Sequence, residues 1–381
     1  MKNSGLRIAI DGRPALWPRT GIGTIASNVL ERIQDFDKTN QYFAYFNNDP
    51  VLGSRGPLRV QCRWGGPRQK LLWANAWLPQ QLKRDGIDVF ITFLDQELPY
   101  VPTHARIVSM VHDLIPLKFP DVVFRNRAHR FYYNTLIRAS IRRSATILTN
   151  SNYSRQEIVR ELGADETKVR KITLGAAPAP LADRSQVAKV LRRYNLRQPF
   201  VIALGSTEPR KNNIRVIEAM RHLHADHLNL QLVIVGSNWR GRAFDPAALD
   251  DRVCLPGHVP DDELPVLLQA AEILVFPSLH EGFGFPVLEA MAAGIPVVSS
   301  NVTAIPEVAG HAALLVNPNS AGEIAAAMVR ILQDRDVAAD LSRRGRARAG
   351  HFRWEITCAE LASLCESLMT RQEWQRQPVT L

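Results

Sequence analysis

Apolar residues recur along the chain in two patterns: short runs rich in β-branched residues, and longer stretches with helical spacing. Runs with the length of buried strands lie at 6–11, 42–46, 58–62, 88–93, 106–111 and 145–149. A second series lies at 200–204, 232–235, 252–255, 273–276 and 295–299. Helical stretches separate these runs. The alternation predicts an α/β protein with two doubly wound, Rossmann-like domains that face each other across a central cleft.

The break between the two series lies at residues 175–199, which hold Pro178, Pro180 and a short charged helix. We therefore expect an N-terminal domain over residues 1–185 and a C-terminal domain over residues 195–353. A helical region over residues 354–381 follows, and we expect it to pack back toward the first domain.

The most informative stretch is residues 278–294, SLHEGFGFPVLEAMAAG. It follows the strand at 273–276 with a glycine-rich turn that carries Glu281. A helix then begins near Pro286, holds Glu289 in its first turn and ends at Gly294, a residue that favours the left-handed C′ conformation. A loop of this kind lies at the carboxyl edge of the sheet, where open α/β sheets bind ligands.

Two interpretations of this stretch remain open on its residues alone. Carboxylates accept hydrogen bonds from sugar hydroxyls, and loop N–H groups with a helix N-terminus favour phosphate. Glu281 and Glu289 would then face one ligand that carries both hydroxyls and phosphate. Alternatively, Glu281 is a solvated loop residue and Glu289 is an acid favoured by the helix dipole.

A second loop follows the strand at 200–204 with the sequence GSTEPRKN over residues 205–212. It resembles a Walker A loop but lacks the second glycine and the Ser or Thr that would hold magnesium, which disfavours an NTPase. It places Arg210 and Lys211 at a helix N-terminus, an arrangement suited to neutralising a diphosphate.

The first domain offers weaker signals. Gly21 and Gly23 open a helix, but about nine residues separate them from the strand at 6–11, so they do not form a dinucleotide fingerprint. His112 and Asp113 follow the strand at 106–111, a position typical of ligand sites and also of structural histidines. Downstream, Ser154 and Glu157 predict a capping box at the start of a helix.

Two helical stretches of the first domain are rich in aromatic residues. Trp73 and Trp77 share a helix face, which predicts core packing, with an acceptor or lipid contact as the alternative. The stretch 124–143 combines aromatic residues with six arginines, a composition typical of helices at anionic membrane surfaces and also of ordinary solvated helices.

Composition narrows the function classes. The chain has 381 residues, of which 46% are hydrophobic and 22% are charged, which is typical of a globular protein. Its four cysteines have no metal-ligand spacing, so we expect a reduced, cytoplasmic setting and no metal site. Neither a signal peptide nor a membrane-spanning run is expected.

Charge is distributed unevenly between the two halves. Residues 1–180 hold 26 Lys and Arg against 15 Asp and Glu, whereas the remaining residues hold 21 against 22. The basic excess belongs to the first half and indicates an anionic partner for it. We expect a peripheral contact with an anionic membrane, at the inner face of the cytoplasmic membrane, and no nucleic acid.

The motifs together resemble the retaining glycosyltransferases of family 4, which have the two-domain GT-B fold. The resemblance rests on residues 205–212, Val235-Gly236, Gly257-His-Val259 and above all residues 277–299, and it extends through IPEVAG at 305–310. It is specific across the second domain and weaker in the first. It implies that the second domain binds a nucleotide sugar and that the first binds a glycan acceptor.

The resemblance also assigns roles to single residues. Glu281 and Glu289 match the two acids of the family's Glu-x7-Glu motif, the first on the donor sugar and the second on the ribose. Lys211, assisted by Arg210, would neutralise the diphosphate, and His112 would approach the donor sugar. The remaining donor-binding positions that it implies are Gly21, Gly23, Ser206, Gly236, Val259, Gly282, Phe283, Gly284, Phe285 and Val287.

One position departs from the family pattern. Many members have Arg directly after the glycine that corresponds to Gly205, and here the residue is Ser206, so Arg210 and Lys211 carry more of the diphosphate charge. The Glu-Pro-Arg-Lys-Asn form at 208–212 resembles bacterial mannosyltransferases that build polysaccharides from GDP-mannose. The resemblance therefore implies a metal-independent, retaining mannosyltransferase that uses GDP-mannose as substrate, needs no cofactor and acts on a lipid-linked glycan in polysaccharide or O-antigen synthesis.

Other functions remain open on the sequence. A transferase that uses a UDP-sugar and a sugar-nucleotide epimerase on the same fold both fit the second domain. A non-catalytic subunit would bind the donor and leave it intact. A nucleotide-dependent oxidoreductase is disfavoured by the position of Gly21 and Gly23.

Overall fold

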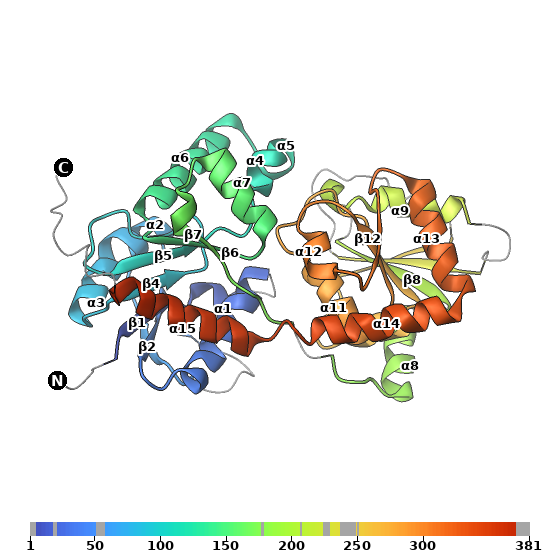
Figure 1. Cartoon of the computed structure of the whole chain (residues 1–381), viewed down its shortest axis with the longest axis horizontal. Helices are drawn as coiled ribbons and strands as arrows, with labels where there is room; N and C mark the ends of the chain where they lie inside the picture. The colour runs from blue at the N-terminus through green and yellow to red at the C-terminus, as the bar shows by residue number, and fades with distance from the viewer. Residues whose placement is uncertain are drawn as a thin grey trace.

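The computed structural model describes residues 5–17, 21–50, 58–176, 179–205, 208–223, 229–236, 249 and 251–370. Within these residues the chain forms two parallel sheets, one of seven and one of six strands, each covered by helices on both faces (Figure 1). The alternating pattern of the sequence therefore predicts the fold class correctly.

The first sheet has the strand order β3-β2-β1-β4-β5-β6-β7. Its strands are β1 (Arg7–Asp11), β2 (Gln41–Phe46), β3 (Gln61–Trp64), β4 (Val89–Thr92), β5 (Arg106–Met110), β6 (Thr146–Thr149) and β7 (Val169–Lys171). The helical segments are η1 (Arg13–Leu16), α1 (Gly21–Phe36), α2 (Lys70–Leu72), η2 (Trp73–Trp77), α3 (Leu78–Arg84), α4 (Ile115–Lys118), α5 (Pro120–Val123), α6 (Arg127–Arg143), α7 (Asn152–Leu162) and η3 (Glu166–Lys168).

The second sheet has the order β10-β9-β8-β11-β12-β13. Its strands are β8 (Phe200–Leu204), β9 (Gln231–Val235), β10 (Val253–Gly257), β11 (Ile273–Phe276), β12 (Val297–Ser300) and β13 (Leu314–Val316). The helical segments are α8 (Arg184–Arg193), η4 (Pro209–Lys211), α9 (Asn213–Arg221), α10 (Leu264–Ala270), α11 (Phe285–Ala293), α12 (Ile305–Ala309), α13 (Ala321–Gln333), α14 (Arg335–Ala349) and α15 (Trp354–Thr370).

Each strand contributes to two cores because successive side chains point to opposite faces of a sheet. In β1, Ile8 and Ile10 join the core under α1, whereas Ala9 joins the core that contains Trp73 and Leu78. In β8, Val201 and Ala203 likewise point to the opposite face from their neighbours. Both faces are apolar, which explains why the strand segments are continuous apolar runs in the sequence.

The aromatic segment around Trp73 is part of a core. Trp73 is fully buried and its ring stacks on that of Trp77 at 5.6 Å between centroids. The prediction that Trp73 packs in a core is therefore confirmed. The helical stretch that carries Trp73 and Trp77 is not one continuous α-helix, because the π-helical segment η2 divides it.

Two predicted helix starts need correction. The arginine-rich helix begins at Arg127, not at residue 124, because Asn126 caps it by accepting a hydrogen bond from the His129 N–H. The capping box predicted for Ser154 and Glu157 is wrong. Helix α7 begins one turn earlier, at Asn152, and its N-cap is Ser151, whose hydroxyl accepts the Ser154 N–H.

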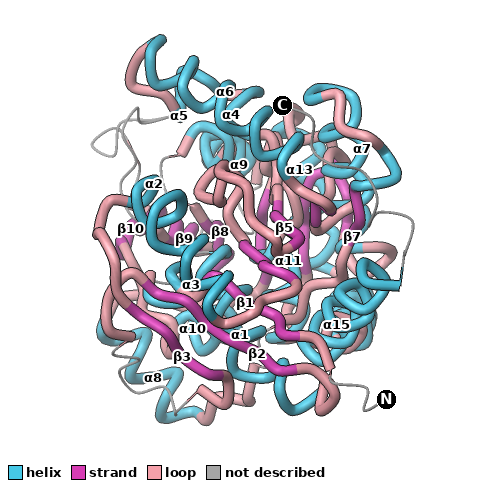
Figure 2. The backbone as a smooth tube through the Cα atoms, turned by 90° about the vertical axis from the view of Figure 1, so that its left-hand side faces the viewer, coloured by secondary structure: helices cyan, strands magenta, loops and turns pink. Residues whose placement is uncertain are grey.

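Helix α15 leaves the second domain and packs along α1 of the first (Figure 1). Figure 2 shows the same helix beside the strands of the first sheet. The Glu360 carboxylate accepts hydrogen bonds from the Thr173 N–H at 2.6 Å and from its hydroxyl at 3.0 Å. In return, Thr357 donates to the Thr173 carbonyl at 2.7 Å. These bonds tie the returning helix to the segment that leaves the first sheet.

We expect Glu360→Ala to lower the free energy of unfolding by about 1–3 kcal/mol, because a half-buried N–H and a hydroxyl lose a charged acceptor. Urea denaturation measures the change. The matched control is Glu366→Ala on the same helix, since Glu366 is exposed and its contact, with Asn40, is 3.5 Å long. Equal destabilisation by both substitutions would contradict the role assigned to Glu360.

Candidate active site

A cavity of about 800 Å³ lies between the two domains, at the carboxyl ends of both sheets. Its volume is within the usual range for small-molecule sites. Twelve of the residues named from the sequence line it: Gly21, His112, Arg210, Lys211, Gly236, Val259, Glu281, Gly282, Phe283, Gly284, Phe285 and Glu289. Segments that are far apart in the sequence thus converge where open sheets bind ligands.

Two predicted donor-binding residues, Gly23 and Val287, do not line this cavity, and a third lies outside the described residues. Gly23 is buried within α1. Val287 is fully buried in α11, and its N–H donates to the Gly284 carbonyl at 3.0 Å. Ser206 lies outside the described residues. Donor contacts at these positions remain predictions.

Asp113, which follows the same strand as His112, also lines the cavity. The other lining residues were not singled out from the sequence as site residues: they are Ile22, Thr24, Asn150, Leu204, Gly205, Val235, His258, Asp261, Leu264 and Pro286. Asn150 directly follows the carboxyl end of β6, so strand position alone could have identified it. It is 6% exposed, and its Oδ1 has no hydrogen-bond partner among the described residues.

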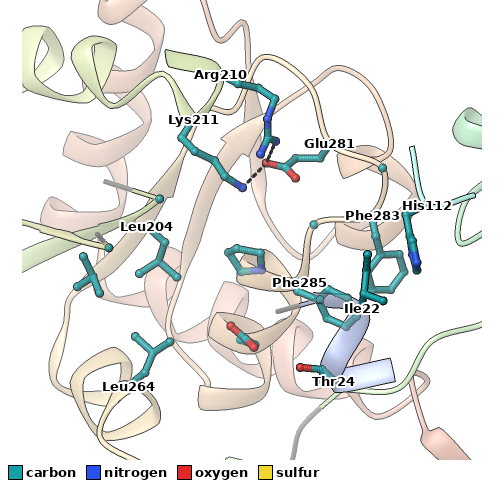
Figure 3. Close-up of a pocket in the computed structure, with 18 of the residues that line it drawn as sticks. Ile22, Thr24, His112, Leu204, Arg210, Lys211, Leu264, Glu281, Phe283 and Phe285 are labelled. Atoms are coloured by element: carbon teal, nitrogen blue, oxygen red, sulfur yellow. Dashed lines mark hydrogen bonds and ion pairs between the residues drawn. The ribbon is translucent and has the colours of Figure 1, made fainter. Parts of the chain in front are cut away.

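The buried carboxylate of Glu281 lines the cavity beside Arg210 and Lys211 (Figure 3). Its Oε1 accepts hydrogen bonds from Lys211 Nζ at 2.7 Å, from Arg210 Nη1 at 2.8 Å and from the Ser278 hydroxyl at 2.8 Å. The cations follow β8 and the carboxylate follows β11. Because β8 and β11 are adjacent and the strand order reverses between them, the three charges meet at the switch point of the second sheet.

Local backbone structure positions the two cations. Arg210 and Lys211 belong to the short 3-10 helix η4, which directly precedes α9, rather than to the first turn of α9 itself. Lys211 packs across Gly205, where an added Cβ would lie 2.4 Å from its Cγ. Gly205 also has a φ of +102°, which L side chains rarely adopt, so glycine is required there for two reasons.

Electrostatics keep Glu281 ionised. Burial alone would raise the pKa of its carboxyl group, but Lys211 and Arg210 outweigh burial and hold the pKa below the ordinary value of 4.5. Asp113 differs, because burial dominates and raises the pKa of its carboxyl group. Of these two carboxyl groups in the cavity, Glu281 is therefore the one held firmly as an anion.

His112 is held as a neutral imidazole. Burial lowers its pKa, although the Phe93 carbonyl and Asp95 act in the opposite direction. Its Nε2 lies 2.8 Å from the Phe93 carbonyl oxygen. Since a carbonyl can only accept, Nε2 carries the proton and Nδ1 is an acceptor. The side chain can accept a hydrogen bond from a hydroxyl group in the cavity.

Glu289 reaches the cavity from the second turn of α11. The helix begins at Phe285, one residue before the start expected near Pro286, so Glu289 is its fifth residue and the prediction that it lies in the first turn is wrong. It still lines the cavity with Glu281. Gly294 has the left-handed conformation expected at the helix C-terminus, with φ of +79°.

The loop that carries Glu281 also contacts the first domain. The Gly282 carbonyl accepts a hydrogen bond from the Ser151 hydroxyl at 2.7 Å, and a Cβ added at Gly282 would lie 2.4 Å from the His112 carbonyl oxygen. The Glu307 carboxylate of α12 accepts the N–H groups of Asn152 and Tyr153 at 2.8 and 2.6 Å. An acid of the second domain therefore caps helix α7 of the first.

Beside this contact, His280 Nε2 lies 3.3 Å from the Glu157 carboxylate, and both side chains are almost fully buried. Burial alone would raise the pKa of Glu157, but His280, Tyr153 and Lys118 together lower it. The residue directly before Glu281 is therefore held by the first domain, which links the position of the carboxylate to the position of the domains.

No three His, Cys, Asp or Glu side chains in the described part of the chain form a group that could hold a metal ion. Within the same residues, no helix combines the length and the apolar character needed to cross a bilayer.

We expect Lys211→Met to raise the pKa of Glu281, because Lys211 contributes most to lowering it. A carboxyl pKa that folding depresses stabilises the protein above its ordinary value of 4.5 and loses this effect as the pH falls through the folded value. The stability deficit of the variant should therefore be largest above about pH 5 and should narrow on acidification.

Urea denaturation at several pH values checks this expectation, with the exposed Lys171→Met as the control for loss of a lysine charge. A deficit for Lys211→Met that does not change with pH would show that the ion pair with Glu281 does not set the stability of the loop.

Comparison with known proteins identifies the family. A model described as "Glycosyl transferases group 1" matches residues 190–348, and one described as "Glycosyltransferase Family 4" matches residues 34–178. O-antigen chain mannosyltransferase B of Escherichia coli is 33% identical over 267 residues, which are 67% of this chain and 69% of that protein. The serotype-specific mannosyltransferase WbdA of Escherichia coli is 30% identical over 266 residues, 66% of this chain and 32% of WbdA.

Solved structures share the fold. Sucrose-phosphate synthase from Thermosynechococcus elongatus matches with a TM-score of 0.71 and 22% identity, over 96% of this chain and 99% of that one. HepE of Anabaena, in complex with UDP-glucose, matches with a TM-score of 0.71 and 17% identity, over 96% and 100%. Together with the two parallel sheets, these matches confirm the GT-B fold. The chain belongs to glycosyltransferase family 4.

Proposed function

We propose that this glycosyltransferase transfers mannose from GDP-mannose, with retention of configuration, to a hydroxyl group of a growing lipid-linked glycan in O-antigen or related polysaccharide synthesis. One observation carries the proposal: Glu281, Arg210, Lys211 and Glu289 line one cavity with His112 of the opposite domain. The names of the mannosyltransferase relatives support mannose as the sugar and O-antigen as the product.

The two acids would divide the donor between them. Among the described residues, the donors to the Glu281 carboxylate all address Oε1, which leaves Oε2 to accept from hydroxyl groups of the hexose. Glu289, on the next turn beyond the loop, would accept from the ribose hydroxyls. This division requires a ligand with two sugar rings joined by a diphosphate, which is the structure of a nucleotide sugar.

The diphosphate would bind between the two cations and the following helix. Arg210 and Lys211 lie directly before α9, whose N-terminus adds a partial positive charge. As the sugar–oxygen bond breaks, negative charge builds on the leaving diphosphate, and these groups stabilise it without rearrangement. They would supply the charge that a divalent cation provides in other transferases, so we propose a metal-independent reaction with no resident cofactor.

Retention follows if the acceptor hydroxyl attacks the anomeric carbon from the face that the diphosphate leaves. The sugar–phosphate bond breaks first and gives the sugar oxocarbenium character. The leaving phosphate oxygen then takes the proton of the acceptor hydroxyl as the new glycosidic bond forms. Neutral His112 can accept a hydrogen bond from a donor hydroxyl and hold the ring without adding a competing positive charge.

GDP-mannose should raise the melting temperature of the protein and should be consumed in the presence of an isolated lipid-linked acceptor, with an α-linkage in the product by NMR. Glu281→Gln and Lys211→Met should each lower turnover by about 10²–10³-fold, because each removes charge aimed at the reacting groups. Lys171→Met is the control and should retain wild-type turnover.

A panel of GDP- and UDP-sugars assigns the base and the sugar. If the protein turns over only a UDP-sugar, that UDP-sugar replaces GDP-mannose as the proposed donor. If the donor is converted when no acceptor is present, the result indicates an epimerase. Near-normal turnover by Glu281→Gln would refute the proposed site.

We also propose that the first domain contacts an anionic membrane at the inner face of the cytoplasmic membrane through the amino half of α6. Phe131 and Tyr132 are 74% and 47% exposed there, next to Arg127 and Arg130. Aromatic side chains between arginines suit the interface of an anionic bilayer, where a lipid-linked acceptor would be present.

Phe131→Ser should reduce binding to vesicles that contain phosphatidylglycerol by about ten-fold or more, because the phenyl ring no longer enters the interface. Flotation measures binding, and high salt should weaken it in wild type. Phe36→Ser on α1 is the matched control, since Phe36 is 48% exposed on a different helix. If Phe131→Ser binds the vesicles as well as wild type does, the membrane contact does not involve Phe131.

A further inference from the structure

A second cavity, of about 540 Å³, lies in the first domain away from the catalytic cleft. It is lined by the beginning of β5 and β6, by the residues around β7, by the end of α6 and by the last turns of α15. Figure 1 shows these strands between α6 and α15. Because Arg106 begins β5 and His112 follows its end, the two cavities lie at opposite edges of the sheet, about 20 Å apart.

The second cavity is strongly basic. Among the described residues, five cationic side chains line it, against one acid, Asp165: they are Arg106, Arg142, Arg143, Lys168 and Arg170. Asp165 already accepts hydrogen bonds from the N–H and the hydroxyl of Thr167, at 2.9 and 2.8 Å. Within the described part of the chain, no acid lies within ion-pair distance of any of the five cations. Apart from the electrostatic interaction of Lys168 with Asp165, their charges are therefore not neutralised locally.

Among the five cations, Arg143 shows the lack of an acidic partner most clearly. Its Nη2 donates to the Val101 carbonyl and to the Thr103 hydroxyl, both at 3.2 Å, and both acceptors are neutral. Burial lowers the pKa of its guanidinium group, and no acid counteracts this effect. A partly buried cation with only neutral acceptors is unfavourable relative to water, and a bound anion would offset that cost.

Helix capping does not explain the cluster. Cations in the last turn of a helix are favoured by its dipole, which accounts for Arg142 and Arg143 at the end of α6. The remaining cations have a different origin: Arg106 and Arg170 lie on strands and Lys168 lies in η3. The elements β5, η3 and β7 thus each add a cation to the cavity, besides the two at the end of α6.

Part of the lining is apolar. Leu364 and Leu368 of α15 belong to it, four residues apart and therefore on one face of the helix. Ala105, just before β5, and Ile107 in β5 add further apolar surface. Several cations suit a phosphate group, which accepts many charged hydrogen bonds, and the leucines suit an apolar substituent on it.

We propose that this cavity is a second, non-catalytic binding site for a phosphate group that carries an apolar substituent. The ligand would lie between the arginines at the edge of the first sheet and the leucines of α15. Its phosphate could come from the headgroup of an anionic lipid or from a soluble phosphate compound. The site is separate from the catalytic cleft, so it does not depend on the proposed donor or acceptor.

Hydrogen–deuterium exchange of the full chain tests the site, with inorganic phosphate in one arm and soluble dihexanoyl phosphatidic acid in the other. Either ligand should slow exchange in residues 103–107, 142–146, 165–170 and 364–368. Protection by inorganic phosphate as well as by the lipid indicates a soluble source, whereas protection by the lipid alone indicates a headgroup. Protection of residues 278–289 would show that the ligand also binds in the cleft between the domains, so these residues distinguish binding at the two sites.

Arg143→Gln should raise the ligand concentration needed for half-maximal protection by about ten- to hundred-fold, since a charged hydrogen-bond donor to phosphate is lost. Arg142→Gln, at an exposed position of the same cavity, should raise it as well and guards against a folding defect of the first variant. Arg138→Gln is the charge-matched control on the same helix and outside the cavity. Absence of protection in wild type with both ligands, or equal affinity of the cavity variants and the control, would overturn the proposal.

Discussion

The carboxylate of Glu281 is the group on which the site depends. It is buried in a cavity between two domains, where an isolated charge would be strongly unfavourable. Arg210 and Lys211 make the burial tolerable, and the same two cations are available to a phosphate in the same cavity. A ligand with a diphosphate would compete for cations that already have a partner, so binding of the donor and the charge state of Glu281 are coupled.

The loop that carries this carboxylate is also a contact between the domains. Ser151 donates to the Gly282 carbonyl, Glu157 lies beside His280, and Glu307 caps helix α7 from the other domain. Movement of one domain away from the other would break these contacts next to the reacting groups. The position of the Glu281 loop therefore depends on contacts with the first domain.

The first sheet uses its two edges differently. At its carboxyl edge, His112 is held neutral and faces a cavity shared with the second domain. At its amino edge, arginines and a lysine surround a cavity that α15 closes with leucines. Part of the basic excess of residues 1–180 is therefore gathered around one cavity.

The sequence by itself determined the alternation of strands and helices, the two-domain fold and most of the named residues that line the cavity between the domains, because apolar periodicity and loop position after a strand are local properties. It could not determine partners that come from distant segments. Glu157 fits a capping box as a local pattern, but the fold places it against His280. Asp113 and Asn150 follow the ends of β5 and β6, which the sequence shows, but only the fold brings them into one cavity with residues of the second domain. The second basic cavity likewise required the return of α15, since residues 364–368 and 142–143 meet only in the folded chain.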